Sequence, residues 1–251
     1  MSSPYLVFSL AASLGAMGEL AGHERRGSLL WPGRSALIGL IGAALGIRRD
    51  GDFSRLDRLK IDVAVFDSGT SLRDFHTIQS VPAAAVKKPN SRPEAIRAAG
   101  GRLTTSITLR DYRAGVFYGV AVQGEGLEEI AAALRKPYFT LYLGRKSCPL
   151  SAPPHPQIVQ ADTVDEALEQ YFTPYLEEYR RLCSADKANE IPKRPEWLAR
   201  HVGCAENVMI VGKEGSQRDL VHDVPLDRQR WHFTAREVGI RHVVLSGKEQ
   251  Q

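Results

Sequence analysis

Two adjacent cations in a glycine-led turn are the clearest sign of chemistry in this sequence. Arg145 and Lys146 lie between Gly144 and Ser147. Neighbouring positive charges repel each other unless an anion lies close to both, and such a turn also offers main-chain amides and a hydroxyl to that anion. Arg34, at the start of a predicted helix, can combine its own charge with the positive end of the helix dipole. Both patterns predict contact with phosphate, although Arg34 can also form a salt bridge that caps the helix.

The positive charge is concentrated in one stretch of the chain. Between residues 73 and 113 there are eight Lys or Arg against three acids, a local charge of +5, whereas the whole chain carries only +4. Residues 125–190 hold eleven acids against seven Lys or Arg. A basic stretch of this kind is where a nucleic-acid ligand is expected. Its candidate RNA-binding side chains are Arg73, His76, Lys87, Lys88, Arg110 and Tyr112.

Each of these candidates also has an ordinary structural explanation. A histidine such as His76 can be a hydrogen-bonded structural residue, and Tyr112 can fill the core as well as stack on a base. Lys87 and Lys88 can contact RNA or a neighbouring subunit, or they can simply be solvated. The residues alone leave these alternatives open.

Apolar runs predict the elements that position these side chains. The predicted strands cover residues 5–10, 62–66, 104–109, 116–122 and 139–143, and the predicted helices cover 34–47 and 127–134. Three prolines and a Gly–Gly pair interrupt residues 80–103, so this basic stretch is expected to leave the body as a hairpin arm or a mobile loop. The remaining order is strand, helix, strand, strand, helix, strand, which is typical of ferredoxin-like and RNA-recognition folds.

The sequence therefore predicts an α+β protein in two parts. Residues 1–150 form a ferredoxin-like (RNA-recognition-like) body, which includes the basic excursion at about 80–103. Residues 151–251 form an acidic, partly helical segment followed by a small β-rich C-terminal unit.

Composition favours a cytoplasmic protein that needs neither a metal nor a cofactor. The three cysteines are widely spaced and odd in number, which suits neither a disulfide framework nor a zinc site. No Lys or Arg precedes the apolar residues 5–17, which are expected to form a strand rather than a signal peptide. Residues 36–47 are too few to cross a bilayer. The sequence has no CxxC pair and no G-x-x-x-x-G-K-[ST] phosphate loop.

Three segments, in this order and at these distances, carry a family resemblance. They are RSALIGLIGAALGIRRD at 34–50, LRDFHT at 72–77 and YFTLYLGRKSCPL at 138–150. Together they closely resemble the CasD family, the Cas-five subunits of type I-E CRISPR surveillance complexes (Cascade). RDY at 110–112 and FTAR at 233–236 support the match.

The resemblance implies a fold and a set of partners. CasD-like proteins have a ferredoxin-like body with a protruding β-hairpin thumb, and residues 80–103 would be that thumb. They hold the 5′ handle of the guide RNA (crRNA) and contact the backbone subunit of the complex. They lie beside the large subunit that reads the target's flanking sequence, so contact with target DNA would be indirect. The resemblance implies a non-catalytic role in antiviral DNA interference, with no membrane partner.

A metal-independent endoribonuclease that processes precursor crRNA is the alternative. Such a cut needs a general base near the 2′-hydroxyl and an acid at the leaving oxygen. His76, Tyr112 and Lys146 are the available side chains. No local pattern fixes them together, and in type I-E systems a separate subunit makes this cut, so no catalytic residue is expected.

Overall fold

One large sheet runs through the computed structural model, which describes residues 2–19, 24–86, 88–185, 207–228, 230 and 232–245. Seven of its nine described strands follow the path β6-β1-β5-β3-β7-β9-β8, and the other two, β2 and β4, pair with β5 outside that path. Neighbouring strands are antiparallel except for the short pairing of β2 with β5. The protein is therefore a mixed α/β fold built on a largely antiparallel sheet.

The centre of the sheet consists of β1 (Ser3–Gly15), β5 (Thr104–Gln123) and β3 (Lys60–Asp67). β1 pairs with one side of β5 and β3 pairs with the other. Residues 116–122 of β5 are all buried, because both faces of the sheet are covered there, and a strand buried on both faces has a continuous apolar run rather than an alternating one. The strands predicted over 5–10 and 62–66 are confirmed within β1 and β3.

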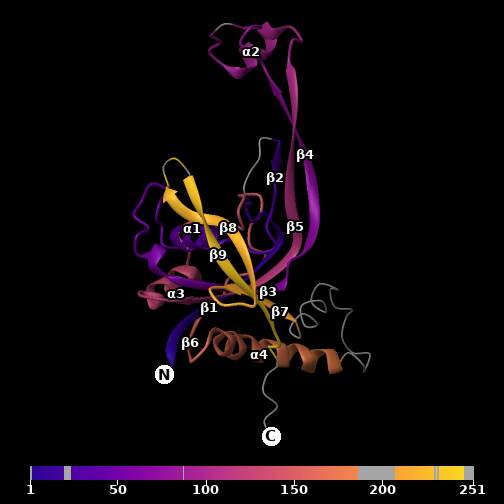
Figure 1. The fold of residues 1–251 in the computed structure, drawn as a ribbon. Coiled ribbons are helices and arrows are strands. Elements are labelled where there is room, and N and C mark those ends of the chain that lie inside the picture. The colour runs from indigo at the N-terminus through magenta and orange to yellow at the C-terminus, as the bar shows by residue number, and fades with distance from the viewer. Residues whose placement is uncertain are drawn as a thin grey trace.

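Helices cover the two faces of the sheet (Figure 1). α1 (Arg34–Ala44) and α3 (Leu127–Arg135) share one apolar core with Tyr118 of β5. α4 (Val164–Ala185) contributes Phe172 to a second core on the opposite face, against Phe66 and Phe117. The helices predicted over 34–47 and 127–134 are confirmed within a few residues at their ends. The predicted acidic segment is helical as far as Ala185, and residues 186–200 lie outside the described residues.

The strand predicted over residues 139–143 is wrong. Residues 137–148 form no strand, and only an isolated bridge joins Tyr142 to Pro149. The physical reason is that the amides of Tyr138 and Phe139 donate to the carbonyls of Ala44 and Ala43 at the end of α1, so this apolar run ends a helix instead of joining the sheet. The fourth strand of the predicted series is β6 (Gln157–Ala161), which pairs with β1.

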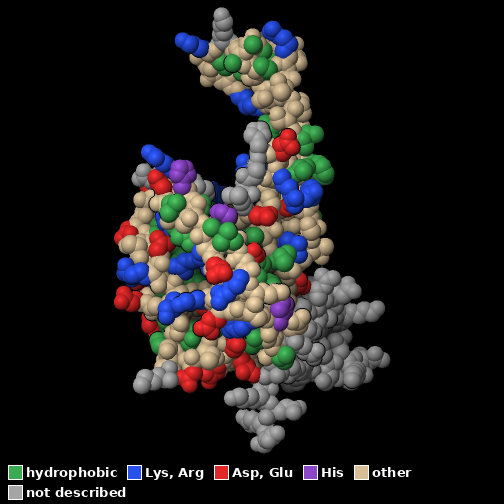
Figure 2. Space-filling view, in the orientation of Figure 1, with side chains coloured by type: hydrophobic (Ala, Val, Ile, Leu, Met, Phe, Trp, Pro, Cys, Tyr) green, Lys and Arg blue, Asp and Glu red, His purple; other side chains and the backbone are tan. Residues whose placement is uncertain are grey.

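A long hairpin rises from the body; we call residues 70–114 the arm. β4 (Thr70–Ser80) pairs with the outer half of β5 from Thr70 opposite Ala114 to Ser80 opposite Thr104. Figure 1 shows this hairpin extending well beyond the body, and Figure 2 shows its tip curving over a hollow, with Lys and Arg side chains at the tip. The predicted excursion, residues 80–103, is therefore only the outer end of a longer projection.

The tip of the arm is more regular than its prolines predicted. It contains α2 (Arg92–Ala99), whose first turn holds Pro93, a position where the missing amide hydrogen is not needed. The Ser91 hydroxyl accepts a hydrogen bond from the Glu94 amide, and the Glu94 carboxylate accepts one from the Asn90 amide. This reciprocal capping explains why a helix begins here.

The C-terminal strands extend the sheet of the body. β7 (Val208–Gly212) pairs with β3 on one side and with β9 (His232–Val243) on the other, and β8 (Gln217–Asp227) forms the edge. The β-rich segment predicted near the C-terminus is thus continuous with the main sheet through β3. A short 3-10 turn, η1 (Leu56–Arg58), lies beside α1.

Two classes of feature are not found in the part of the chain that the structure describes. No described helix combines the length and the apolar character needed to cross a membrane. The described side chains contain no group of three or more His, Cys, Asp or Glu that could hold a metal ion. Cys148 is buried and free.

Candidate nucleic-acid interface at the base of the arm

The base of the arm places polar side chains on both faces of one hairpin. Successive residues of a strand point to opposite faces, and Arg73 lies opposite Asp111 while Leu72 lies opposite Tyr112. We call these the Asp111 face and the Tyr112 face. The predicted residue Arg73 belongs to the Asp111 face, and Arg110 belongs to the Tyr112 face.

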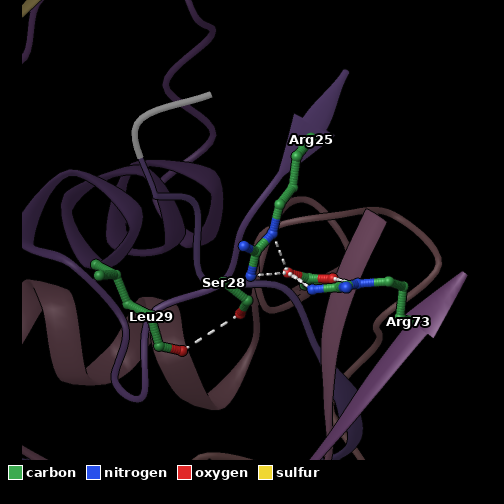
Figure 3. Close-up of polar contacts among 5 residues, drawn as sticks. Arg25, Ser28, Leu29 and Arg73 are labelled. Carbon is green, nitrogen blue, oxygen red and sulfur yellow. Dashed lines mark hydrogen bonds and ion pairs between the residues drawn. The ribbon is translucent and has the colours of Figure 1, made fainter. Parts of the chain in front are cut away.

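On the Asp111 face, one carboxylate holds two arginines (Figure 3). Arg73 donates from Nε to Asp111 Oδ1 at 2.7 Å and from Nη2 to Oδ2 at 3.2 Å. Arg25, from β2 (Arg25–Arg26), donates from Nε to Oδ2 at 2.9 Å. The Asp111 side chain is only 8% exposed, whereas those of Arg25 and Arg73 are 59% and 43% exposed. The three side chains therefore present net positive charge to solvent.

We expect this three-residue cluster to lose its contribution to stability only in acid. The hydrogen bond from Arg73 has the largest influence on the pKa of Asp111; burial opposes it, the bond from Arg25 adds to it, and the pKa falls to about 2. Because the unfolded value is about 3.9, the stabilisation is complete above about pH 5 and is lost as the pH falls through about 2.

Thermal melting of the wild type and of Asp111→Asn checks this expectation. The difference between their melting temperatures should stay constant from about pH 5 to about pH 8 and shrink below about pH 4. A difference that changes with pH near neutrality would contradict it.

On the Tyr112 face, two arginines carry nitrogen atoms without partners. The Arg145 guanidinium carbon lies 4.5 Å from the centroid of the Tyr112 ring. Arg145 Nη1 and Arg110 Nε are both buried, and neither has a hydrogen-bond partner among the described residues. Buried N–H groups of charged side chains are costly to leave unpaired, so this face is suited to an anionic oxygen.

The loop that carries Arg145 is held against the end of β1. The Ala16 amide donates to the Leu143 carbonyl, and the Cys148 amide donates to the Arg145 carbonyl. Gly144 has φ +83° and passes so close to Ala16 that a Cβ would overlap its carbonyl oxygen. The predicted phosphate turn is thus fixed in place, with Lys146 exposed beside Arg145.

Arg34 is used inside the protein. Its guanidinium donates to the carbonyls of Leu59 at 2.7 Å and Asp57 at 2.6 Å, and burial lowers its pKa from the ordinary value. Its amide, at the start of α1, donates to Asp223 Oδ2 at 2.6 Å. The chain's own carboxylate therefore occupies the position where a phosphate was expected. This geometry favours the structural alternative, and an RNA contact of Arg34 stays a prediction.

The other predicted residues lie farther out on the arm. His76 is half-buried on the Tyr112 face, and its carbonyl accepts a hydrogen bond from the Thr108 hydroxyl. Lys88 is exposed near the tip, with φ +44°. Lys87 lies outside the described residues. The RNA contacts predicted for these three side chains stay predictions.

The side chains proposed for catalysis are not gathered at one point. His76 pairs with Thr108, four residues from Tyr112 along β5, which is roughly 14 Å at about 3.4 Å per residue. The structure records no contact of His76 with Tyr112 or with Lys146. The geometry thus gives no support to an acid–base pair formed by these side chains.

Sequence reasoning missed two residues of the Asp111 face. Arg25 lies in a Gly-rich segment with no apolar pattern, and its two-residue strand gave no signal. Asp111 was counted only as an acid that reduces the positive charge of the arm. The adjacent Arg110-Asp111-Tyr112 run was a usable signal, since alternation along a strand sends its neighbours to different faces.

These features define a mixed α/β protein whose main sheet extends into a basic arm. The chain belongs to the family described as CRISPR-associated protein (Cas_Cas5), whose model matches residues 5–239. It is 33% identical over 184 residues to the "CRISPR system Cascade subunit CasD" of Escherichia coli (strain K12), a match that covers 66% of this chain and 76% of the relative. The resemblance predicted from the sequence is thereby confirmed.

Two solved structures are similar over almost the whole chain. A chain of a "CRISPR RNA-guided surveillance complex" has a TM-score of 0.64 and 28% identity, covering 96% of this chain and 90% of its own. A second, titled "Crystal structure of Cas protein", has a TM-score of 0.59 and 25% identity, covering 97% and 96%.

Proposed function

We propose that this chain is a non-catalytic, guide-RNA-binding subunit of a CRISPR surveillance complex of the Cascade type. On this proposal the base of the arm holds the 5′ handle of the crRNA. The observation that carries it is the pair of buried guanidinium nitrogens on the Tyr112 face, Arg110 Nε and Arg145 Nη1, which have no partner among the described residues. Phosphate oxygens of a bound strand are the acceptors that we propose for these two groups.

The chemistry of this face suits single-stranded RNA. An unpaired strand offers phosphates and exposed bases, and proteins that hold one combine cations with aromatic rings. Here Tyr112 lies beneath the Arg145 guanidinium, and planar guanidinium groups bind phosphate through two parallel hydrogen bonds. Lys146 adds a further exposed charge next to the same site.

The fold proposed for this role is a ferredoxin-like body with the arm as its thumb. The chain order β1, α1, β3, β5, α3, β6 supports the ferredoxin-like body, because it repeats the strand–helix–strand unit of that fold with antiparallel neighbours. The long hairpin supports the assignment of the arm as the thumb, because both its strands continue far beyond the body (Figure 1).

The partners we propose are the crRNA, the backbone subunit and the large subunit of the complex, with target DNA contacted only indirectly. The name of the E. coli relative as a Cascade subunit supports assembly into such a complex. The exposed basic tip of the arm, far from the core of the body, supports a contact with a neighbouring molecule (Figure 2).

The test is a salt series of guide-RNA binding by filter retention. Arg110→Gln and Arg145→Gln should each weaken retention and lower the log–log salt slope by about 0.7, the value for one phosphate contact on a single strand. Arg218→Gln, which removes an exposed arginine of β8 from the far edge of the sheet, is the matched control and should leave the slope unchanged. Unchanged slopes in both arm variants would refute the proposed site.

The proposal that the protein does not cut RNA needs a separate measurement. End-labelled precursor repeat RNA should stay intact on incubation with the protein, with or without EDTA. A discrete cut that disappears in His76→Ala would instead identify a processing nuclease.

A further inference from the structure

Asp111 is an acid at the base of the arm, the part of the molecule that is proposed to hold the guide RNA. Because a carboxylate repels phosphate, a count of charges alone predicts that Asp111 weakens the binding of an anion. Its surroundings suggest a different role: it is almost fully buried, it lies between two arginines, and each arginine directs its Nε at the carboxylate.

The two arginines come from separate elements, and both contact the Asp111 carboxylate. Arg73 is carried by β4 and Arg25 by β2, a strand of two residues that pairs with β5. Asp111 lies on β5, between them. Like charges this close repel each other, so without the carboxylate both long side chains would separate and regain their rotational freedom. The carboxylate therefore fixes both guanidinium groups in one orientation.

Both guanidinium groups keep donors for a further ligand. Arg73 uses Nε and Nη2 on Asp111, and Arg25 also reaches Asp111 through Nε and Nη2. The Nη1 groups remain, on side chains that are about half exposed. Each Nη1 group carries two N–H donors, and charge-assisted hydrogen bonds from guanidinium groups are strong contacts to phosphate oxygens.

We propose that Arg25 and Arg73 form a phosphodiester-binding site on the Asp111 face, and that Asp111 is the positioning residue that holds them for it. This inference rests on the proposed function, since the ligand is a phosphate of the guide RNA. It adds a site on the opposite face of the hairpin from Arg110 and Arg145, so the bound strand engages both sides of the base of the arm.

The positioning role of Asp111 and simple charge repulsion predict opposite effects on guide-RNA binding when the Asp111 charge is removed. Removing the negative charge with Asp111→Asn should weaken guide-RNA retention by roughly tenfold, the size of one lost charge-assisted contact, and lower the log–log salt slope by up to about 1.4 for two phosphates. Asp111→Glu keeps a carboxylate and should recover part of the affinity.

Asp74→Asn is the matched control. Asp74 lies on the same hairpin but on the Tyr112 face, opposite Arg110, and no hydrogen bond to an arginine is recorded for it. Its removal should leave retention unchanged or improve it, as the loss of a negative charge near an anion normally does.

A double-mutant cycle with the full-length chain decides the question. In an Arg25→Gln/Arg73→Gln background, Asp111→Asn should cause no further loss, because it acts only through those side chains. Thermal melting of each variant shows whether it is folded; if Asp111→Asn is not, the single variants Arg25→Gln and Arg73→Gln should each lower the slope by about 0.7.

The outcomes separate this inference from the proposed function. If Asp111→Asn binds as well as Asp74→Asn, or if its loss persists in the double-arginine background, the positioning role is refuted while RNA binding stands. If neither single arginine variant changes the slope, the phosphate site is refuted. If the wild type retains no guide RNA at low salt, the proposed function and this inference both fall.

Discussion

Gly144→Ala is expected to weaken guide-RNA retention at least as strongly as Arg145→Gln, without changing a single charge. Gly144 has φ +83°, a conformation that costs an alanine about 1–2 kcal/mol, and its new Cβ would overlap the Ala16 carbonyl oxygen. Since Leu143 is hydrogen-bonded to Ala16, the clash cannot be relieved without displacing the turn that carries Arg145. We expect a loss of at least about 2 kcal/mol in the free energy of unfolding, measured by urea titration, with retention measured by filter binding.

Gly101→Ala provides a control matched in backbone conformation. Gly101 has φ +84°, almost the same as Gly144, but apart from its chain neighbours no described residue has an atom within 4 Å of the Cβ position. This variant carries the conformational cost alone, about 1–2 kcal/mol, and should retain guide RNA. If Gly144→Ala behaves like Gly101→Ala in both assays, close packing of the turn against β1 is not what positions Arg145.

Asp223→Ala is expected to be among the most destabilising single substitutions in this chain. Asp223 is 3% exposed and accepts hydrogen bonds from Arg236 Nε at 2.7 Å and Nη2 at 3.1 Å, and from the Arg34 amide at 2.6 Å. Removing the carboxylate leaves the Arg236 guanidinium and the first amide of α1 without their acceptor. Breaking a buried ion pair costs about 3 kcal/mol or more, and urea titration measures the loss.

Asp219→Ala is the control for this prediction, because it removes a carboxylate from the same strand that makes no buried contacts. Asp219 is exposed and, among the described residues, accepts a hydrogen bond from the neighbouring Leu220 amide alone, so its loss should change the free energy of unfolding by less than about 0.5 kcal/mol. Equal effects of the two substitutions would show that Asp223 does not hold β8 and β9 to α1.

The parts of the fold that could be predicted are those with a burial signal. Residues 116–122 are buried on both faces and 127–134 carry an amphipathic pattern, so strand and helix were assigned correctly. β4 gave no such signal, because nearly all of Thr70–Ser80 is exposed, and a hairpin with two solvated faces has no apolar period. The run at 139–143 gave a false signal, since apolar residues that pack on a helix end have the same composition as a buried strand.

The sequence indicated which residue types form the site, but it did not indicate how those residues are arranged in space. Arg145 and Tyr112 were both named, but their stacking depends on the loop that Gly144 brings to the end of β1. Arg34 was named for a helix terminus, and the sequence contains no hint that Asp223, 189 residues later, supplies the anion there. Arg25 and Asp111 are 86 residues apart, and their contact required the pairing of β2 with β5.

The register of the arm limits which changes in length it can accept. Side chains alternate between its two faces along the paired residues 70–80 and 104–114, so inserting or deleting one residue there would exchange the faces for everything on one side of the change. Insertions between residues 81 and 103 leave that pairing untouched, and lengthening a loop costs little. Natural variation in the length of this arm should therefore accumulate at its tip and occur near its base only in steps of two.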